Sequence, residues 1–100
     1  MRKVKKEELE EISQRRKGAV ALREVLIEDM DLSGFDFSGM DFTLSSFRGV
    51  RLENVNLRGA VIENALLDGC SLRRSVFQDA DMKTASLRYC DMTGCDIRGA

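Results

Sequence analysis

Residues 80–100 read ADMKTASLRYCDMTGCDIRGA, and a large apolar residue returns in this segment at every fifth position. The spacing is unbroken over fourteen positions: Leu32, Phe37, Phe42, Phe47, Leu52, Leu57, Ile62, Leu67, Leu72, Phe77, Met82, Leu87, Met92 and Ile97. A second column, two residues ahead of the first, holds only Ser, Ala, Cys or Val from position 45 onward. A period of five matches neither an α-helix, with about 3.6 residues per turn, nor the two-residue period of a long strand.

This period predicts a chain that turns a corner after every five residues. The first and third side chains of each five point inward and the second points outward, as in a very short strand. The remaining two residues form the corner, where Gly or Asn often stands, and both are common turn residues. Four such sides close a square coil of about twenty residues, and successive coils stack at about 4.8 Å.

These residues resemble the pentapeptide-repeat proteins, whose motif is A(D/N)LXX. Residues 80–84 (ADMKT) and 95–99 (CDIRG) match the motif closely, and the resemblance covers residues 30–100. It implies an all-β solenoid, a right-handed quadrilateral β-helix of about four coils with a short N-terminal α-helix. We therefore divide the chain into an N-terminal helical cap, residues 1–19, and a β-helix, residues 20–100.

The residues before the regular repeat lack its period. Residues 5–17 read as a helix, since Leu9 and Ile12 share one face and Gly18 is a natural C-terminal stop. Residues 20–29 keep the phase of the repeat and form either a first coil or more helix. Bulky residues replace the small ones at three early inward positions, where we expect them to fill a wider end of the core under the helix; these residues are Met30, Phe35 and Met40.

The composition narrows the possible functions. The chain has 100 residues, enough for one domain, with 16 Lys+Arg, 17 Asp+Glu and a net charge of −1. This balance argues against direct binding of nucleic acid, and the absence of His excludes Ser-His-Asp and Cys-His catalysis. We expect a protein that is not an enzyme and holds neither a cofactor nor a metal. The charged N-terminus and the lack of long apolar runs predict a cytoplasmic protein that does not enter a membrane.

Three cysteines lie in the inward column of small residues. Cys70 and Cys90 are twenty residues apart and should stack, while Cys95 lies one side over. We interpret all three as free, slowly reacting thiols that behave as small hydrophobic residues. A disulfide between Cys70 and Cys90, or a zinc site, is the alternative interpretation.

Six aspartates stand directly before a central apolar residue: Asp31, Asp36, Asp41, Asp81, Asp91 and Asp96. Their side chains can bond to the backbone of the corner. They are also the candidate acids for imitation of DNA. Other charges form vertical columns of alternating sign, such as Arg48, Asp68 and Arg88.

Apolar residues at outward positions indicate a surface for a protein partner. The candidates are Leu44, Val61, Leu66, Val76 and Tyr89. We expect Leu44, Val61 and Leu66 to cluster around one edge of the rod, because a contiguous apolar patch marks a binding surface.

The resemblance implies a function for such a rod. Some pentapeptide-repeat proteins imitate duplex DNA and thereby inhibit or protect DNA gyrase, and small bacterial or phage proteins, anti-CRISPR proteins among them, use the same mimicry against defence complexes. We therefore expect an inhibitor or protector whose partner is a bacterial DNA-binding enzyme or defence complex. The alternative is a protein-binding module without DNA mimicry, which binds through the apolar edge or the N-terminal helix.

The final coil predicts a homodimer joined through residues 80–100. Its residues are small and flat, and they leave the edges of the final strands bare; they include Cys90, Gly94, Cys95, Gly99 and Ala100. We expect Gly94→Arg to separate the two copies.

Overall fold

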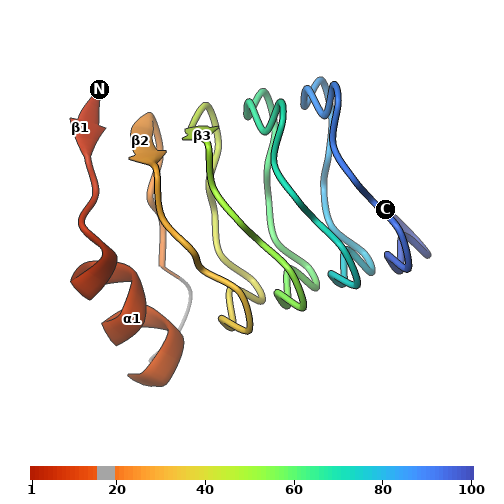
Figure 1. Ribbon diagram of the computed structural model, residues 1–100, viewed down its shortest axis with the longest axis horizontal. Coiled ribbons are helices and arrows are strands. Elements are labelled where there is room, and N and C mark those ends of the chain that lie inside the picture. The colour runs from red at the N-terminus through yellow and green to blue at the C-terminus, as the bar shows by residue number, and fades with distance from the viewer. Residues whose placement is uncertain (16–19) are drawn as a thin grey trace.

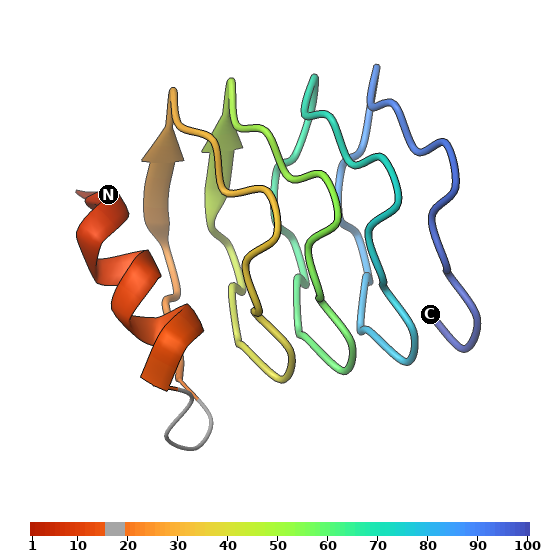
Figure 2. The same ribbon diagram turned by 60° about the horizontal axis from the view of Figure 1, so that its bottom comes forward.

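The computed structural model describes residues 1–15 and 20–100 and is drawn in two views in Figures 1 and 2. Its regular elements are β1 (Arg2–Lys3), α1 (Lys6–Arg15), β2 (Val25–Glu28) and β3 (Ser46–Arg48). The three strands form one parallel sheet in the order β1-β2-β3. After β3 the chain continues as stacked turns of the same shape, running from green to blue in Figure 1.

The coil returns to the same place every twenty residues. β2 pairs with β3 in the register of Leu26 with Ser46 and Glu28 with Arg48. Isolated parallel bridges continue this separation through the chain: Ala21–Asp41, Asp31–Arg51, Asp36–Asn56, Asp41–Val61, Ser46–Leu66, Arg51–Ser71, Asn56–Val76, Val61–Asp81, Leu66–Ser86, Ser71–Asp91 and Val76–Asp96. Residues 20–29 therefore belong to the coil, and of the two alternatives for this segment the helix is wrong.

Each corner is a tight turn with a left-handed residue at its end. The backbone N–H of Phe35 donates to the carbonyl of Leu32 at 3.1 Å, and the equivalent bond recurs at most later corners. The final residue of the five has a positive φ, 81° at Gly34 and 56° at Asn54. Only Gly, and to a lesser degree Asn and Asp, adopts this conformation readily, which explains the recurrence of Gly and Asn at this position.

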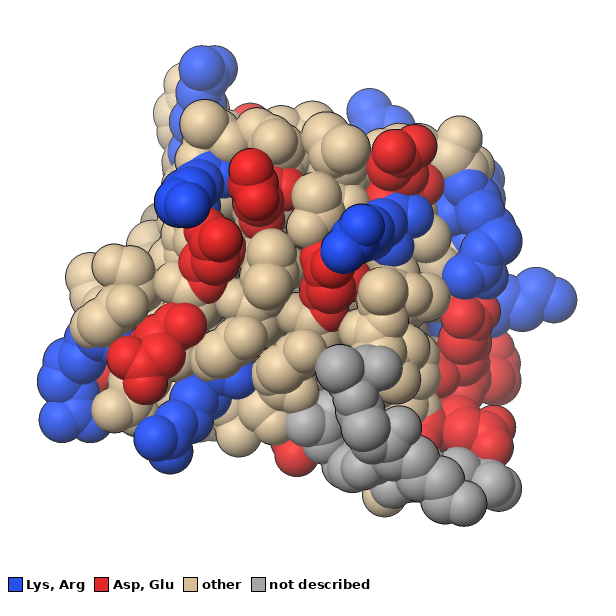
Figure 3. All heavy atoms as spheres, turned by 180° about the vertical axis from the view of Figure 1, so that it is seen from behind, with Lys and Arg blue, Asp and Glu red and all other residues tan. Residues whose placement is uncertain are grey.

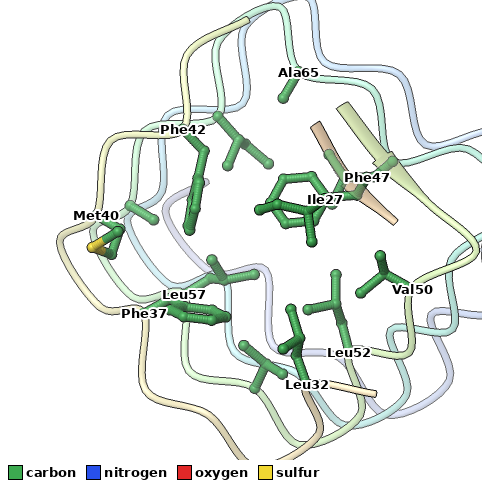
Figure 4. Packing of buried hydrophobic residues seen from close by; sticks show 14 of the residues in the cluster. Ile27, Leu32, Phe37, Met40, Phe42, Phe47, Val50, Leu52, Leu57 and Ala65 are labelled. Carbon is green, nitrogen blue, oxygen red and sulfur yellow. The ribbon is translucent and has the colours of Figure 1, made fainter. Parts of the chain in front are cut away.

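The predicted inward columns form the core (Figure 4). Leu57 and Leu67 are 2% and 1% exposed, so their predicted burial is confirmed. Phe37, Phe42 and Phe47 follow one another around one coil with ring centroids 5.4 and 5.2 Å apart. Burial of this apolar surface is the main force that holds a coil with such short strands together.

The column of large apolar residues at every fifth position is less buried at its C-terminal end. Met82, Leu87 and Met92 are only partly buried, and Ile97 is 57% exposed. Within the described part of the chain, no further coil stacks on residues 81–100, so the outer surface of these side chains stays uncovered.

The N-terminal end differs from the expected cap in one respect. β1 pairs in parallel with β2, and the N–H of Val4 donates to the carbonyl of Leu26 at 2.9 Å, so a strand that the five-residue period does not predict precedes the helix. α1 follows and buries Leu9 completely, while the N–H of Asp36 donates to Ser13 Oγ at 2.9 Å.

The expected residues of the helix end, 16–17, and the stop at Gly18 lie outside the described residues. The three bulky early residues do join the core: Met40 is buried, and Met30 and Phe35 pack against it partly exposed. Among the described residues, no helix is long and apolar enough to cross a membrane.

Candidate functional site

The six candidate acids each brace the corner that follows them. Each carboxylate accepts a hydrogen bond of 2.9 to 3.1 Å from the backbone N–H two residues later. The pairs are Asp31–Ser33, Asp36–Ser38, Asp41–Thr43, Asp81–Lys83, Asp91–Thr93 and Asp96–Arg98. Asn56 accepts the same hydrogen bond from the backbone N–H of Arg58 at 3.0 Å, so a neutral amide can also brace this corner. The position of these acids is explained by the backbone turn.

The same acids are dispersed over three sides of the coil. Asp31 and Asp91 share one column, but Arg51 and Ser71 separate them. Asp36 and Asp96 occupy a second column, and Asp41 and Asp81 a third. On the face shown in Figure 3, acidic side chains are interrupted by basic and uncharged ones, and no continuous acidic band crosses it.

Arginines offset part of the acidic charge. Arg23 Nη2 lies 2.6 Å from Asp41 Oδ2, and Arg98 Nη2 lies 2.7 Å from Asp96 Oδ2. The hydrogen bond from the Arg98 side chain, followed by that from its backbone N–H, lowers the pKa of Asp96 to about 2. Two of the six candidates are thus committed to close ion pairs within the chain, which reduces the charge that they offer to a partner.

One side of the coil carries the strands and can be named for them. The strand side consists of residues 25–29, 45–49, 65–69 and 85–89, and it contains β2 and β3. β1 extends it at the N-terminal end, as the row of three arrows in Figure 1 shows. Its outward residues form two columns: Leu26, Ser46, Leu66 and Ser86 in the first, and Glu28, Arg48, Asp68 and Arg88 in the second.

The exposed apolar side chains gather around the strand side. Among the described residues, the exposed large hydrophobic ones are Met1 (72%), Leu44 (44%), Leu66 (51%), Tyr89 (94%) and Ile97 (57%). Leu66 lies on the strand side, and Leu44 and Tyr89 stand at its two bordering corners. Met1 precedes β1 at the N-terminal end of this side. The structure therefore places three of the five predicted apolar candidates on or at the borders of the strand side, with its charged column between Leu66 and Tyr89, and adds Met1 through β1.

The other two apolar candidates, Val61 and Val76, lie on other sides of the coil. Val61 is half-buried on the neighbouring side, in the column of Asp41 and Asp81. Val76 is half-buried on the side opposite the strand side, where its column also holds Asn56. Asn64 forms the corner between Val61 and Leu66, and Leu44 stands at the same corner one coil earlier. These three residues therefore border one corner, as expected, whereas Val76 does not contribute to that surface.

Leu44 and Tyr89 occupy corner positions that favour glycine. Their φ values are 62° and 61°, in the left-handed region. The equivalent positions in neighbouring coils hold Asn64 and Gly69, which adopt this conformation at lower cost. A residue with a side chain costs about 1–2 kcal/mol there relative to its ordinary conformation.

The cysteines are free and donate to carbonyl groups of the preceding coil. Cys90 Sγ lies 3.0 Å from the carbonyl oxygen of Leu67, and Cys95 Sγ lies 2.8 Å from that of Leu72. Burial raises the pKa of Cys70 to about 11 and raises those of Cys90 and Cys95. Cys70 is buried, whereas Cys90 and Cys95 are partly exposed, and the slow reaction of all three stays a prediction.

Two shallow hollows mark the surface near these features. One, of about 260 Å³, lies on the strand side and is lined by Ser46, Phe47, Arg48, Gly49, Leu66 and Asp68. A larger one, of about 510 Å³, lies at the outer edge of the last coil between Asp79 and Ala100. Within the described part of the chain, no three His, Cys, Asp or Glu side chains come together as metal ligands would.

The candidate dimer residues Cys90, Gly94, Cys95, Gly99 and Ala100 lie on or near that outer edge. Gly94 has a φ of 73°, and a Cβ atom there would approach Arg74 Cγ to 3.2 Å. Arginine at position 94 would therefore strain the coil itself, so Gly94→Arg cannot report cleanly on a dimer. Ile97→Glu, at an exposed side chain, is a better probe of this edge.

Comparison with known proteins identifies the same five-residue repeat. The family model for pentapeptide repeats matches in eight copies, over residues 22–59, 56–88 and 65–100. A solved structure that matches is that of a pentapeptide repeat protein from the cyanobacterium Cyanothece 51142, with 23% sequence identity and a TM-score of 0.42. The match covers 76% of this chain and 58% of that one, so this chain spans little more than half the length of that protein. No curated protein matches the sequence.

Proposed function

The chain belongs to the pentapeptide-repeat family, whose members form right-handed β-helices, and from this premise we propose that it is a non-enzymatic protein that binds a protein partner on its strand side. The observation that carries the proposal is the position of the exposed apolar residues. Four of the five surround this one side, namely Met1, Leu44, Leu66 and Tyr89. Exposed apolar residues that gather in this way mark a surface for a protein.

Backbone strain supports the same surface. Leu44 and Tyr89 stand in a conformation that glycine adopts without penalty, and they are 44% and 94% exposed. Neither burial nor the turn accounts for a large apolar residue there. Glu24, Arg74 and Thr84 share this positive φ, so the conformation alone does not single out Leu44 and Tyr89. What distinguishes these two is an exposed large apolar side chain at such a corner, which favours a role in binding.

DNA mimicry is the finer function that the resemblance implies, and it has less support. The candidate acids lie in three separated columns, brace corners and partly pair with arginines. The molecule measures 27 × 24 × 22 Å, so even its longest dimension equals only about eight base pairs at about 3.4 Å each. We propose binding to an apolar protein surface as the primary function and keep mimicry as the competing one.

A paired set of variants tests the proposal. Leu44→Asn and Leu66→Ser introduce residues that the neighbouring coils already carry in the same columns, Asn64 and Ser86, so the fold should be retained. Val76→Asn, which repeats the side chain of Asn56 in its column, is the matched control on the opposite side. Immobilised wild type and variants would be compared for the proteins that they retain from a bacterial lysate, with quantification by mass spectrometry.

The proposal expects a set of proteins that the wild type and Val76→Asn retain and that Leu44→Asn/Leu66→Ser loses. Equal retention by all variants would contradict it. Mimicry predicts a different result, in which inhibition of purified DNA gyrase depends on Asp31, Asp36, Asp41, Asp81, Asp91 and Asp96 and weakens with salt. Asparagine variants at these positions keep the turn and remove only the charge.

A further inference from the structure

We propose that the partner that fits the strand side is a second copy of this chain, packed face to face with its coil axis reversed. The inference rests on the proposed function, because it uses the same surface, and it identifies the occupant. It differs from the end-to-end dimer expected through residues 80–100. The order of the outward residues along the two columns of the strand side favours this arrangement.

The charged column is complementary to its own reverse. Read from the N-terminal coil, it runs Glu28, Arg48, Asp68, Arg88, with signs that alternate at each level. Each coil contributes one level to this column. A two-fold axis can lie in the interface, parallel to the strands and midway between the level of Arg48 and the level of Asp68. It places Arg48 opposite Asp68 of the second copy and Glu28 opposite Arg88 of the second copy. Each of these four levels then meets the opposite charge, which favours association. Glu28 already forms an ion pair within the chain, with Lys3 Nζ of β1 at 2.9 Å from its Oε1, so the two central contacts between Arg48 and Asp68 carry most of the attraction.

The other outward column alternates in size and is complementary in the same way. It runs Leu26, Ser46, Leu66, Ser86, so the same axis places Leu66 opposite Ser46 of the second copy. The hollow of about 260 Å³ on the strand side is lined by Ser46, Gly49 and Leu66. An exposed leucine thus meets a shallow hollow at a small residue, and the reciprocal contact forms at the same time, as in any two-fold interface.

The two corners that border the strand side fit the same arrangement. Tyr89, 94% exposed, comes opposite Asp29 of the second copy, where its phenol can donate to the carboxylate. Leu44 comes opposite Asn64 of the second copy. Both corner residues thereby contact the second copy.

Other two-fold arrangements of the same side are less complementary. An axis parallel to the coil axis would place Leu66 against Asp68, an apolar residue against a charge. An axis through a level, such as that of Arg48, would place Glu28 opposite Asp68, and like charges in an interface are costly. Only an axis between levels opposes unlike charges, and the central one uses all four levels.

Charge reversal tests this arrangement. In a dimer of Arg48→Glu, the new carboxylate at position 48 would face Asp68 of the second copy. In a dimer of Asp68→Arg, two positive charges would face each other. Because like charges repel, each variant should dimerise about tenfold more weakly or worse. In a mixture of the two, both contacts become attractive again. Sedimentation equilibrium of the full chain, from micromolar to millimolar concentration, would measure wild type, each variant and the mixture, with circular dichroism as the check on folding.

The inference expects a concentration-dependent wild-type dimer, loss of association in each single variant and recovery of a heterodimer on mixing. Arg58→Glu, on the opposite side, is the matched control and should dimerise as the wild type does. Leu66→Ser weakens the dimer without any change of charge, so the test survives if a charge variant fails to fold.

Three results would overturn the inference. The first is a wild type that is monomeric throughout, and the second is a mixture of folded variants that does not associate. The third is a dimer that resists Arg48→Glu but is lost in Ile97→Glu, which would support the end-to-end pair instead. A monomeric wild type that still loses a captured protein on Leu66→Ser would overturn the inference and leave the proposed function standing.

Discussion

The hydroxyl of Ser45 donates a 2.6 Å hydrogen bond to the backbone carbonyl of Leu22, twenty-three residues earlier in the chain. The N–H of Val25 in turn donates to Ser45 Oγ at 3.3 Å. At other corners the equivalent N–H donates directly to the carbonyl, as Phe35 does to Leu32. The serine side chain thus bridges a corner of the coil below it, and Ser75 does the same with Leu52 and Val55.

Replacement of this bridge should destabilise the coil. Ser45→Ala removes a buried acceptor from the Val25 N–H, and we expect a loss of roughly 1–3 kcal/mol in the free energy of unfolding. Ser45→Cys retains a donor, as Cys90 and Cys95 do at equivalent positions, and should lose less. Urea unfolding of the three proteins measures the difference, and an alanine variant as stable as the wild type would contradict the bridging role.

Two adjacent leucines belong to different columns, Leu67 to an inward one and Leu66 to an outward one. Leu67 is 1% exposed and Leu66 is 51% exposed, so the same substitution probes the core at one position and the surface at the next. We expect Leu67→Ala to cost about 2–5 kcal/mol and Leu66→Ala less than about 1 kcal/mol. Leu57→Ala should behave as Leu67→Ala, and Asp68→Ala should cost much less than either. Equal losses at positions 66 and 67 in urea unfolding would mean that the register is wrong.

The five-residue period predicts the coil because each large central residue must be buried against its neighbours of the preceding and following coils. Four sides of five residues make one turn of twenty, which places residues twenty apart in one column. The sequence therefore predicts that Ser46 and Leu66 are neighbours. β1 was not predictable in this way, since a strand of two residues is too short to show a period. Its pairing depends on the bare edge of β2 and on the burial of Val4.

The candidate site was predicted only in part for a related reason. The sequence predicts Leu44, Val61 and Leu66 at one edge, but the contribution of Tyr89 requires that the two corners of one side be recognised as its borders. Met1 joins them only through β1. The partial exposure of Cys90 and Cys95 depends on what covers the last coil, which a pattern within the chain does not specify.

The thiols should react in an order set by their burial. Burial disfavours the thiolate and raises the pKa of Cys70 to about 11, and it also limits access of a reagent. We expect Cys70 to label more slowly than Cys90 and Cys95 in the folded protein. Peptide mass spectrometry after timed exposure to a maleimide at pH 8 measures the order. In urea the three should label at similar rates, and preferential labelling of Cys70 in the folded protein would contradict the coil as described.

Asp96 should contribute a pH-dependent part of the stability. Its hydrogen bonds from the Arg98 side chain and backbone N–H lower its pKa to about 2, against about 3.9 in an unfolded chain. A carboxyl group with a lowered pKa in the folded state stabilises the protein above the unfolded value. That contribution is fully present above about pH 5 and is lost as the pH falls from about 4 to about 2.

Asp96→Asn isolates this contribution because it retains an oxygen for the Arg98 N–H, as Asn56 does for Arg58 in the same column. We expect the variant to be less stable than the wild type at pH 7, and the difference to shrink between about pH 4 and pH 2. Urea unfolding across this range measures it, and Arg98→Gln, which removes the ion pair from the other side, should follow the same course. High salt should reduce the difference, since Arg98 is exposed. Wild-type and Asp96→Asn curves that stay parallel from pH 7 to pH 2 would show that the ion pair does not stabilise the fold.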